Sequence, residues 1–233
     1  MQDDGTGTIG VFPARDIPPI CALELGETLY HLRAALDGAV YAAAIRQTGQ
    51  NPPPDQNHLE FPVYFRPRDF EQHARKIAPL SQNCRTFIES VQPYNTPKGL
   101  APEIKIVSIN RNLGILSDWA RKDRHRQLHI VASWASSASP KVFAPAGTSV
   151  RYIRVATDGF LEDNGDIAAF AIDGFIPSMK WEVKANPHLS LDIAVNETPK
   201  PCADNDTLGN RLLHMIVAVS AVVGTLEDLV LRK

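Results

Sequence analysis

The chain has 233 residues, 44% hydrophobic and 21% charged, which is the composition of a globular protein with a sizeable core. Its formal net charge of −2 excludes a whole-chain attraction to nucleic acid or to an anionic membrane. The scattered residues Cys21, Cys84 and Cys202 argue against a disulfide framework and favour a cytoplasmic location. The most apolar run, 215–226, is shorter than the roughly 20 residues that span a bilayer, so we expect no membrane segment.

The N-terminal third of the chain predicts one long helix between two irregular stretches. Residues 1–20 contain Gly and Pro without a helical period, which indicates an irregular segment. Leu25 to Ala44 repeats apolar residues at three- and four-residue steps and predicts the first helix. Arg33 and Asp37 lie four residues apart beside this apolar stripe.

Two further helices are predicted in the middle of the chain, after a proline-rich connector at 47–60. Arg68 to Val91 keeps the helical period, with Pro79 indicating a kink or a break. The third helix is expected from about Asn110 to Ala135, and it places Asp123 and Arg124 at its core-facing side.

From Pro140 the hydrophobic period changes from that of a helix to that of a strand. Short strands separated by tight turns predict an antiparallel sheet. The strand-like segments are 150–156, 166–172, 179–183 and 189–195. The last segment, 207–231, is apolar nearly all round and predicts a helix central to the helical core.

The sequence therefore predicts an α+β protein, in which a four-helix bundle carries an antiparallel β insertion between its third and fourth helices. We expect the irregular N-terminal segment at 1–20. The bundle is expected at 21–139 and 204–233, and the β insertion at 140–203.

Four segments resemble a bacterial protein family of uncharacterised function. The first helix matches a Gly-Asp/Glu-x-Leu-His-x-Leu-Arg-Ser/Ala-Ala-Leu-Asp pattern from Gly26 to Asp37. Phe-Pro-Val at 61–63, Gln-Pro-Tyr at 92–94 and Asp-Arg-His-Arg at 123–126 follow in the family's order. The resemblance covers most of the chain and implies no particular activity.

The family pattern differs from this chain at two positions. Gly38 stands where a His is usual, and Arg124 stands where a Lys is usual. An Arg-x4-His pattern on a helix resembles the signature of HEPN ribonucleases, in which an Arg and a His on a helical bundle cleave RNA. The copy that begins at Arg33 lacks its His, whereas Arg124 and His129 keep the spacing. The resemblance thus implies a HEPN-like bundle.

The charged residues beside the apolar stripes favour an architectural interpretation. Burying Arg33, Asp37, Asp123 and Arg124 without partners would be costly. We therefore expect a network across the helices, from Arg33 to Asp123 and from Asp37 to Arg124. The protein would then be a structural or interaction module.

An alternative hypothesis is metal-independent RNA cleavage by Arg124, His125, Arg126 and His129. A local basic patch attracts phosphates, an Arg can stabilise a developing negative charge, and a His can move a proton near neutral pH. A solvated basic face is the plainer interpretation of the same residues. The partners left open are RNA, another protein and a second copy of the chain.

Metal and cofactor sites are not predicted. Glu27 and His31 lie four residues apart, but no third ligand has suitable spacing. No glycine-rich phosphate loop is present, so we expect no cofactor. A cleft between bundle and sheet that binds a small ligand remains a third hypothesis.

Overall fold

The computed structural model of the chain describes residues 4–10, 18–97, 108–124, 130–136, 142–143, 147–155, 159–160, 166–176, 184–185, 190–195 and 207–231. The protein is α+β, with helices and antiparallel strands. It divides into two compact units, which are described separately. The β unit comprises Met1–Pro18, Ile130–Asn196 and Asn205–Leu208, and the helical unit comprises Pro19–His129, Glu197–Asp204 and Gly209–Lys233.

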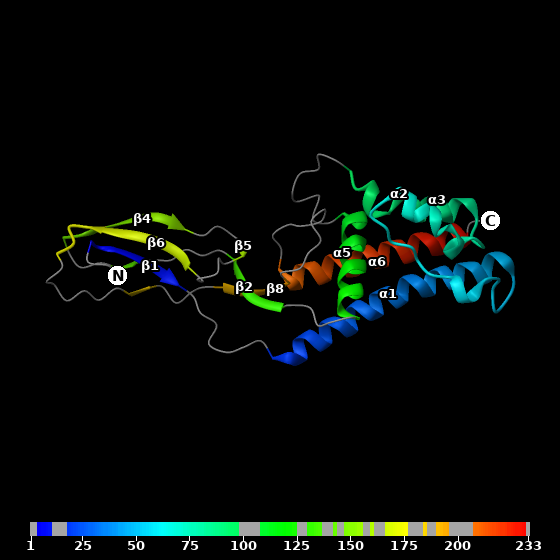
Figure 1. The fold of residues 1–233 in the computed structure, drawn as a ribbon, viewed down its shortest axis with the longest axis horizontal. Coiled ribbons are helices and arrows are strands. Elements are labelled where there is room, and N and C mark those ends of the chain that lie inside the picture. The colour runs from blue at the N-terminus through cyan, green and yellow to red at the C-terminus, as the bar shows by residue number, and fades with distance from the viewer. Residues whose placement is uncertain are drawn as a thin grey trace. The chain divides into compact units, whose positions relative to one another are not determined.

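The helical unit is built around α1 (Pro19–Thr48), α5 (Ile109–Asp123) and α6 (Leu208–Leu231). α5 contacts α1 and runs across the direction of α1 and α6 (Figure 1). The predicted stripe of the first helix is buried, and so is one face of α5 and of α6. The main core residues are Leu25, Leu29, Leu36, Val40, Leu113, Ile115, Leu116, Trp119, Met215, Ala218, Val222 and Leu226.

Short helices fill the chain between α1 and α5. They are η1 (Gln56–His58), α2 (Pro67–Gln72), η2 (Ala74–Ile77), α3 (Gln82–Ser90) and η3 (Pro93–Asn95). The predicted helix from Arg68 to Val91 is thus interrupted around Pro79, which has no N–H to continue the helical ladder. The chain restarts at Ser81, whose hydroxyl accepts from the Cys84 N–H and caps α3.

The third helix ends earlier than the sequence predicts. α5 ends at Asp123, and residues 130–136 form strand β2 instead of continuing the helix to Ala135. The prediction is wrong there because Val131 and Trp134 pair with a strand that is remote in sequence. Local periodicity contains no information about such a partner, and β-branched and aromatic residues fit a pleated sheet well.

The β unit contains a three-stranded antiparallel sheet in the order β1, β6, β4. The strands are β1 (Thr6–Gly10), β4 (Ser149–Val155) and the central β6 (Asp166–Asp173). The expectation of an irregular segment at 1–20 is wrong for residues 6–10, since β1 pairs along β6. Gly7 lies opposite Phe170, whose ring would meet a Cβ at this position at 2.7 Å. A glycine therefore allows the aromatic ring to cover β1.

A second three-stranded sheet has the order β5, β2, β8, and β3 pairs with β7. Its strands are β2 (Ile130–Ser136), β5 (Gly159–Phe160) and β8 (Ser190–Val195), and the two-stranded pair is β3 (Val142–Phe143) and β7 (Lys184–Ala185). Gly174 follows β6 with φ 83° and makes the turn that the sequence indicates. The predicted strand 179–183 lies outside the described residues.

The last helix has the bounds that the sequence predicts within one residue, but it is more exposed than a central core helix. By length and composition alone, α6 could cross a membrane, although a core helix meets the same test. The expectation of no membrane segment considered only the run 215–226, whereas α6 has 24 residues. One face of α6, including Arg211, is buried in the helical unit, while other apolar residues remain exposed.

Candidate functional site

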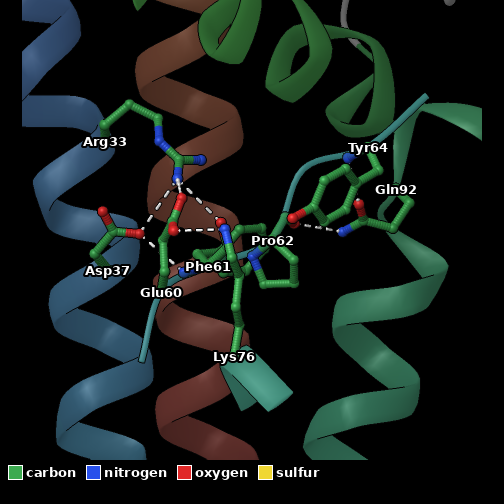
Figure 2. Close-up of polar contacts among 8 residues, drawn as sticks. All are labelled: Arg33, Asp37, Glu60, Phe61, Pro62, Tyr64, Lys76 and Gln92. Carbon is green, nitrogen blue, oxygen red and sulfur yellow. Dashed lines mark hydrogen bonds and ion pairs between the residues drawn. The ribbon is translucent and has the colours of Figure 1, made fainter. Parts of the chain in front are cut away.

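Arg33 and Asp37 of α1 hold both backbone groups of Phe61 (Figure 2). Arg33 Nη2 donates to the Phe61 carbonyl at 3.0 Å, and Asp37 Oδ1 accepts from the Phe61 N–H at 2.9 Å. The two side chains also pair with each other at 3.3 Å. Since Phe61 is fully buried, its backbone needs such partners. The charged pair therefore fixes the entry of an irregular segment into the core.

Glu60 extends this pair to η2. Its carboxylate pairs with Arg33 Nη2 at 3.3 Å and with Lys76, whose amine rises from η2 in Figure 2. Lys76 also lies over the ring of Tyr64, 5.7 Å from its centroid. Partial burial lowers the pKa of Lys76, but the hydrogen bond and charge of Glu60 outweigh this effect and raise it. We call Arg33, Asp37, Glu60 and Lys76 the charge cluster.

Gln92 holds the same segment from the side of α3. Its amide oxygen accepts from the Tyr64 N–H at 2.9 Å, and its amide nitrogen donates to the Pro62 carbonyl at 2.8 Å and to the Ile88 carbonyl at 2.9 Å. Ile88 lies in the last turn of α3, where carbonyls lack a helical partner. One buried side chain thus joins the end of α3 to residues 62–64.

A cavity of about 480 Å³ opens between α1 and α5, beside the charge cluster. Its lining residues are Gly26, Tyr30, Arg33, Ala34, Asp37, Glu60, Ala120, Asp123 and Arg124. Arg33 Nη1 is buried and has no hydrogen-bond partner in the described part of the chain. Arg124 is exposed at the end of α5. The cavity therefore carries charged groups of both signs.

Asp123 lies against the backbone of α1 at Gly26. A Cβ added to Gly26 would be 2.5 Å from the Asp123 Oδ2 atom. The glycine at position 26 therefore leaves the space that the Asp123 carboxylate occupies against α1. Gly38, further along the same helix, has open space where a Cβ would be.

The Gly26→Ala and Gly38→Ala variants should differ in stability. Gly38→Ala should raise the free energy of unfolding by about 0.5–1 kcal/mol, as expected for a helix interior without steric conflict. Gly26→Ala should gain less stability than Gly38→Ala, because the added methyl must displace the Asp123 carboxylate. Urea denaturation followed by circular dichroism checks both variants. An equal gain in the two variants would contradict this packing.

Asp37 has a raised pKa. Burial raises it most, while the charge of Arg33 and the Phe61 N–H lower it by less. At pH below both the unfolded and the folded pKa, the group is protonated in both states and carries no penalty. As the pH rises above about 4, the ordinary value for Asp, the unfolded state ionises first and folding becomes less favourable.

The Asp37→Asn variant isolates the effect of Asp37 ionisation on stability. Its amide cannot ionise, but its amide oxygen can still accept from the Phe61 N–H. The stability of the natural chain relative to Asp37→Asn should decrease as the pH rises from the ordinary pKa of Asp through the raised one. Urea denaturation of both proteins over this interval measures the difference. A relative stability that increases over the same interval would contradict the raised pKa.

The four residues of the predicted charge network all line this cavity, but the pairing differs from the expectation. Arg33 pairs with Asp37 and Glu60, and within the described residues neither Asp123 nor Arg124 forms an ion pair with α1. Glu60 takes the place expected for Asp123 because the chain at 60–64 passes beside α1. Arg124 lies at the cavity rim, whereas His125, Arg126 and His129 lie outside the described residues.

Sequence reasoning missed Glu60, Lys76 and Gln92 as site residues. Glu60 and Gln92 each adjoin or belong to a segment with a family resemblance, which is the signal that could have found them. Lys76 carries no comparable signal. Within the described part of the chain, no three His, Cys, Asp or Glu side chains are grouped to hold a metal ion.

Comparison with known proteins adds no identification. The chain matches no protein-family model, no curated protein and no solved structure.

Proposed function

We propose that the helical unit is a non-catalytic binding module, a HEPN-like four-helix bundle in which the charge cluster organises a ligand cavity. The supporting observation is that the cavity between α1 and α5 is lined by charged groups of both signs, of which Asp123 and Arg124 form no ion pair within the described residues. Its volume of about 480 Å³ suits a small molecule. The charge cluster then has an architectural role, since it holds the wall of the cavity at Phe61.

The arrangement of charges favours a zwitterionic ligand. Arg33 and Arg124 both line the cavity, and their guanidinium groups supply positive charge for a carboxylate or phosphate. The Asp123 carboxylate forms no hydrogen bond within the described residues, and it offers acceptors for an ammonium group. A ligand with both groups would pair with charges of opposite sign in the cavity, through hydrogen bonds that the charges strengthen.

A thermal-shift and calorimetric screen tests this proposal. The probes are the twenty amino acids as zwitterions, spermidine as a cation and citrate as an anion. At least one amino acid should raise the unfolding temperature, and Asp123→Asn and Arg124→Gln should each weaken its binding about 10- to 100-fold. Arg75→Gln, outside the cavity, is the control. Absence of any zwitterion effect, or equal effects in all variants, would overturn the proposal.

A HEPN-like ribonuclease is the second candidate, favoured by one observation. Arg124 is exposed at the cavity rim and directly precedes the segment that contains His125, Arg126 and His129. Purified protein should then cleave labelled RNA without metal, and Arg126→Ala and His129→Ala should lose this activity. Equal background cleavage by all three proteins would end the candidate.

A further inference from the structure

The exposed side of α6 carries an apolar ridge at one end and a hollow at the other. Leu213, Ile216 and Val217 are 56%, 44% and 56% exposed. One turn beyond Ser220, Gly224 has open space where a Cβ would be. Next to Gly224 lies a groove of about 300 Å³ between α1 and α6. We call Leu213, Ile216 and Val217 the ridge, and Gly224 with the neighbouring groove the hollow.

The ridge and the hollow are related by the position of Ser220. Ile216 lies four residues before Ser220, and Gly224 lies four residues after it. Val217 and Val223 are likewise three residues on either side, and Val223 lines the groove. The four-residue spacing corresponds to about 6 Å along the helix and the three-residue spacing to about 4.5 Å. A two-fold axis at Ser220 would therefore place each ridge over the hollow of the other copy.

We propose that this face binds a second copy of the chain, with the two α6 helices antiparallel and crossing at Ser220. Such an interface is isologous, since the same surface contributes both the ridge and the hollow. This face is separate from the ligand cavity, which lies between α1 and α5. A second copy would cover the apolar residues that are exposed together on α6.

The area of this face is sufficient for a dimer. With 24 residues, α6 is about 36 Å long, and a helix is about 10 Å wide, so its exposed side covers about 360 Å². A strip of about the same area on α1, which borders α6 along the groove at Ala39, Ala42 and Arg46, would bring each copy to about 700 Å². The total of about 1,400 Å² lies within the roughly 1,200–2,000 Å² of specific interfaces.

A membrane is the less suitable occupant. The opposite face of α6 packs into the helical core and includes Arg211, so crossing a bilayer would require the helix to leave that core. The exposed side of α6 also carries Glu227 and Asp228. One side of α6 is already packed, and the narrow apolar stripe on its other side has the width of one further helix.

Cysteine cross-linking tests the geometry on the full chain. Residue 220 faces itself across the proposed axis, so Ser220→Cys should form a disulfide-linked dimer under mild oxidation. Gly209→Cys, exposed on the same helix but far from the axis, should cross-link no more than the unsubstituted chain with its native cysteines. Stronger cross-linking of Gly209→Cys than of Ser220→Cys would overturn the antiparallel arrangement.

Sedimentation and light scattering test the association itself. The natural chain should have twice its mass of 25.6 kDa at micromolar concentration. Ile216→Glu, which charges the ridge, and Gly224→Leu, which fills the hollow, should both be monomeric with unchanged circular dichroism. Ile153→Glu, at an exposed apolar position in the β unit, should remain dimeric. A monomeric natural chain, or one that partitions into phosphatidylcholine vesicles, would overturn the proposal.

Discussion

Replacing Gln92 by Leu should lower the free energy of unfolding of the helical unit by about 3 kcal/mol or more. Gln92 is 0% exposed and makes three hydrogen bonds to backbone groups. Leu is similar in size, so little of the effect comes from lost packing. The Tyr64 N–H and the Pro62 carbonyl would be left without this partner, and each unsatisfied buried group costs about 1–3 kcal/mol.

Gln82→Leu is the matched control for Gln92→Leu. Gln82 is exposed, and within the described residues its side chain hydrogen-bonds only to the Thr86 hydroxyl, at 3.2 Å. Its replacement should therefore change stability by at most about 0.5 kcal/mol. Urea denaturation followed by far-ultraviolet circular dichroism compares the two variants. Similar losses in both would show that Gln92 does not hold the 62–64 segment.

A Gln92→Glu variant separates the acceptor from the donors. The carboxylate can still accept from the Tyr64 N–H, but an ionised group cannot donate to the Pro62 and Ile88 carbonyls. The variant should therefore be destabilised at neutral pH and recover part of its stability on acidification, when the carboxyl is protonated and can donate one hydrogen bond. A pH-independent loss would mean that the two donated bonds contribute little.

Replacing Arg33 by Ala should cost about 2–3 kcal/mol of unfolding free energy. The side chain is 15% exposed and pairs with two carboxylates as well as the Phe61 carbonyl. Its removal leaves Asp37 and Glu60 close together, with Lys76 as the remaining cation of the charge cluster. We expect a smaller loss of unfolding free energy than for a completely buried ion pair, because Asp37 and Glu60 are partly exposed.

Arg75→Ala is the control for Arg33→Ala. Arg75 is 65% exposed and pairs with Asp55 at 2.8 Å, and exposed pairs of this kind contribute about 0–1 kcal/mol. Both variants should be measured at low and at moderate salt, since salt screens the exposed pair more effectively. If Arg33→Ala loses no more stability than Arg75→Ala, the charge cluster is not an architectural element.

The charge cluster and Gln92 together give a physical reason for the segments singled out in the sequence. Segments around Arg33, Phe61 and Gln92 are far apart along the chain but meet at residues 60–64. Asp123 and Arg124 adjoin them across the cavity. Backbone groups of an irregular segment must find partners when they are buried, and here side chains from two helices supply them.

Local sequence was sufficient for the elements with a clear period. The apolar spacing of residues 25–44 predicts α1, and alternation predicts β4, β6 and β8 near their observed bounds. The break near Pro79 also follows from the sequence, because proline lacks the N–H that a helix needs. These features depend on residues that are neighbours in the chain.

The tertiary structure alone decided the features that depend on distant residues. β1 and β2 exist because β6 and β8 pair with them, which no local pattern contains. Likewise, the apolar stripe correctly indicates that Arg33 needs partners, but only the path of residues 60–64 makes Glu60 and the Phe61 backbone those partners. The sequence by itself thus indicated that Arg33 and Asp37 needed compensation, and the fold determined which atoms supply it, because hydrogen bonds and ion pairs act over a few ångströms in space.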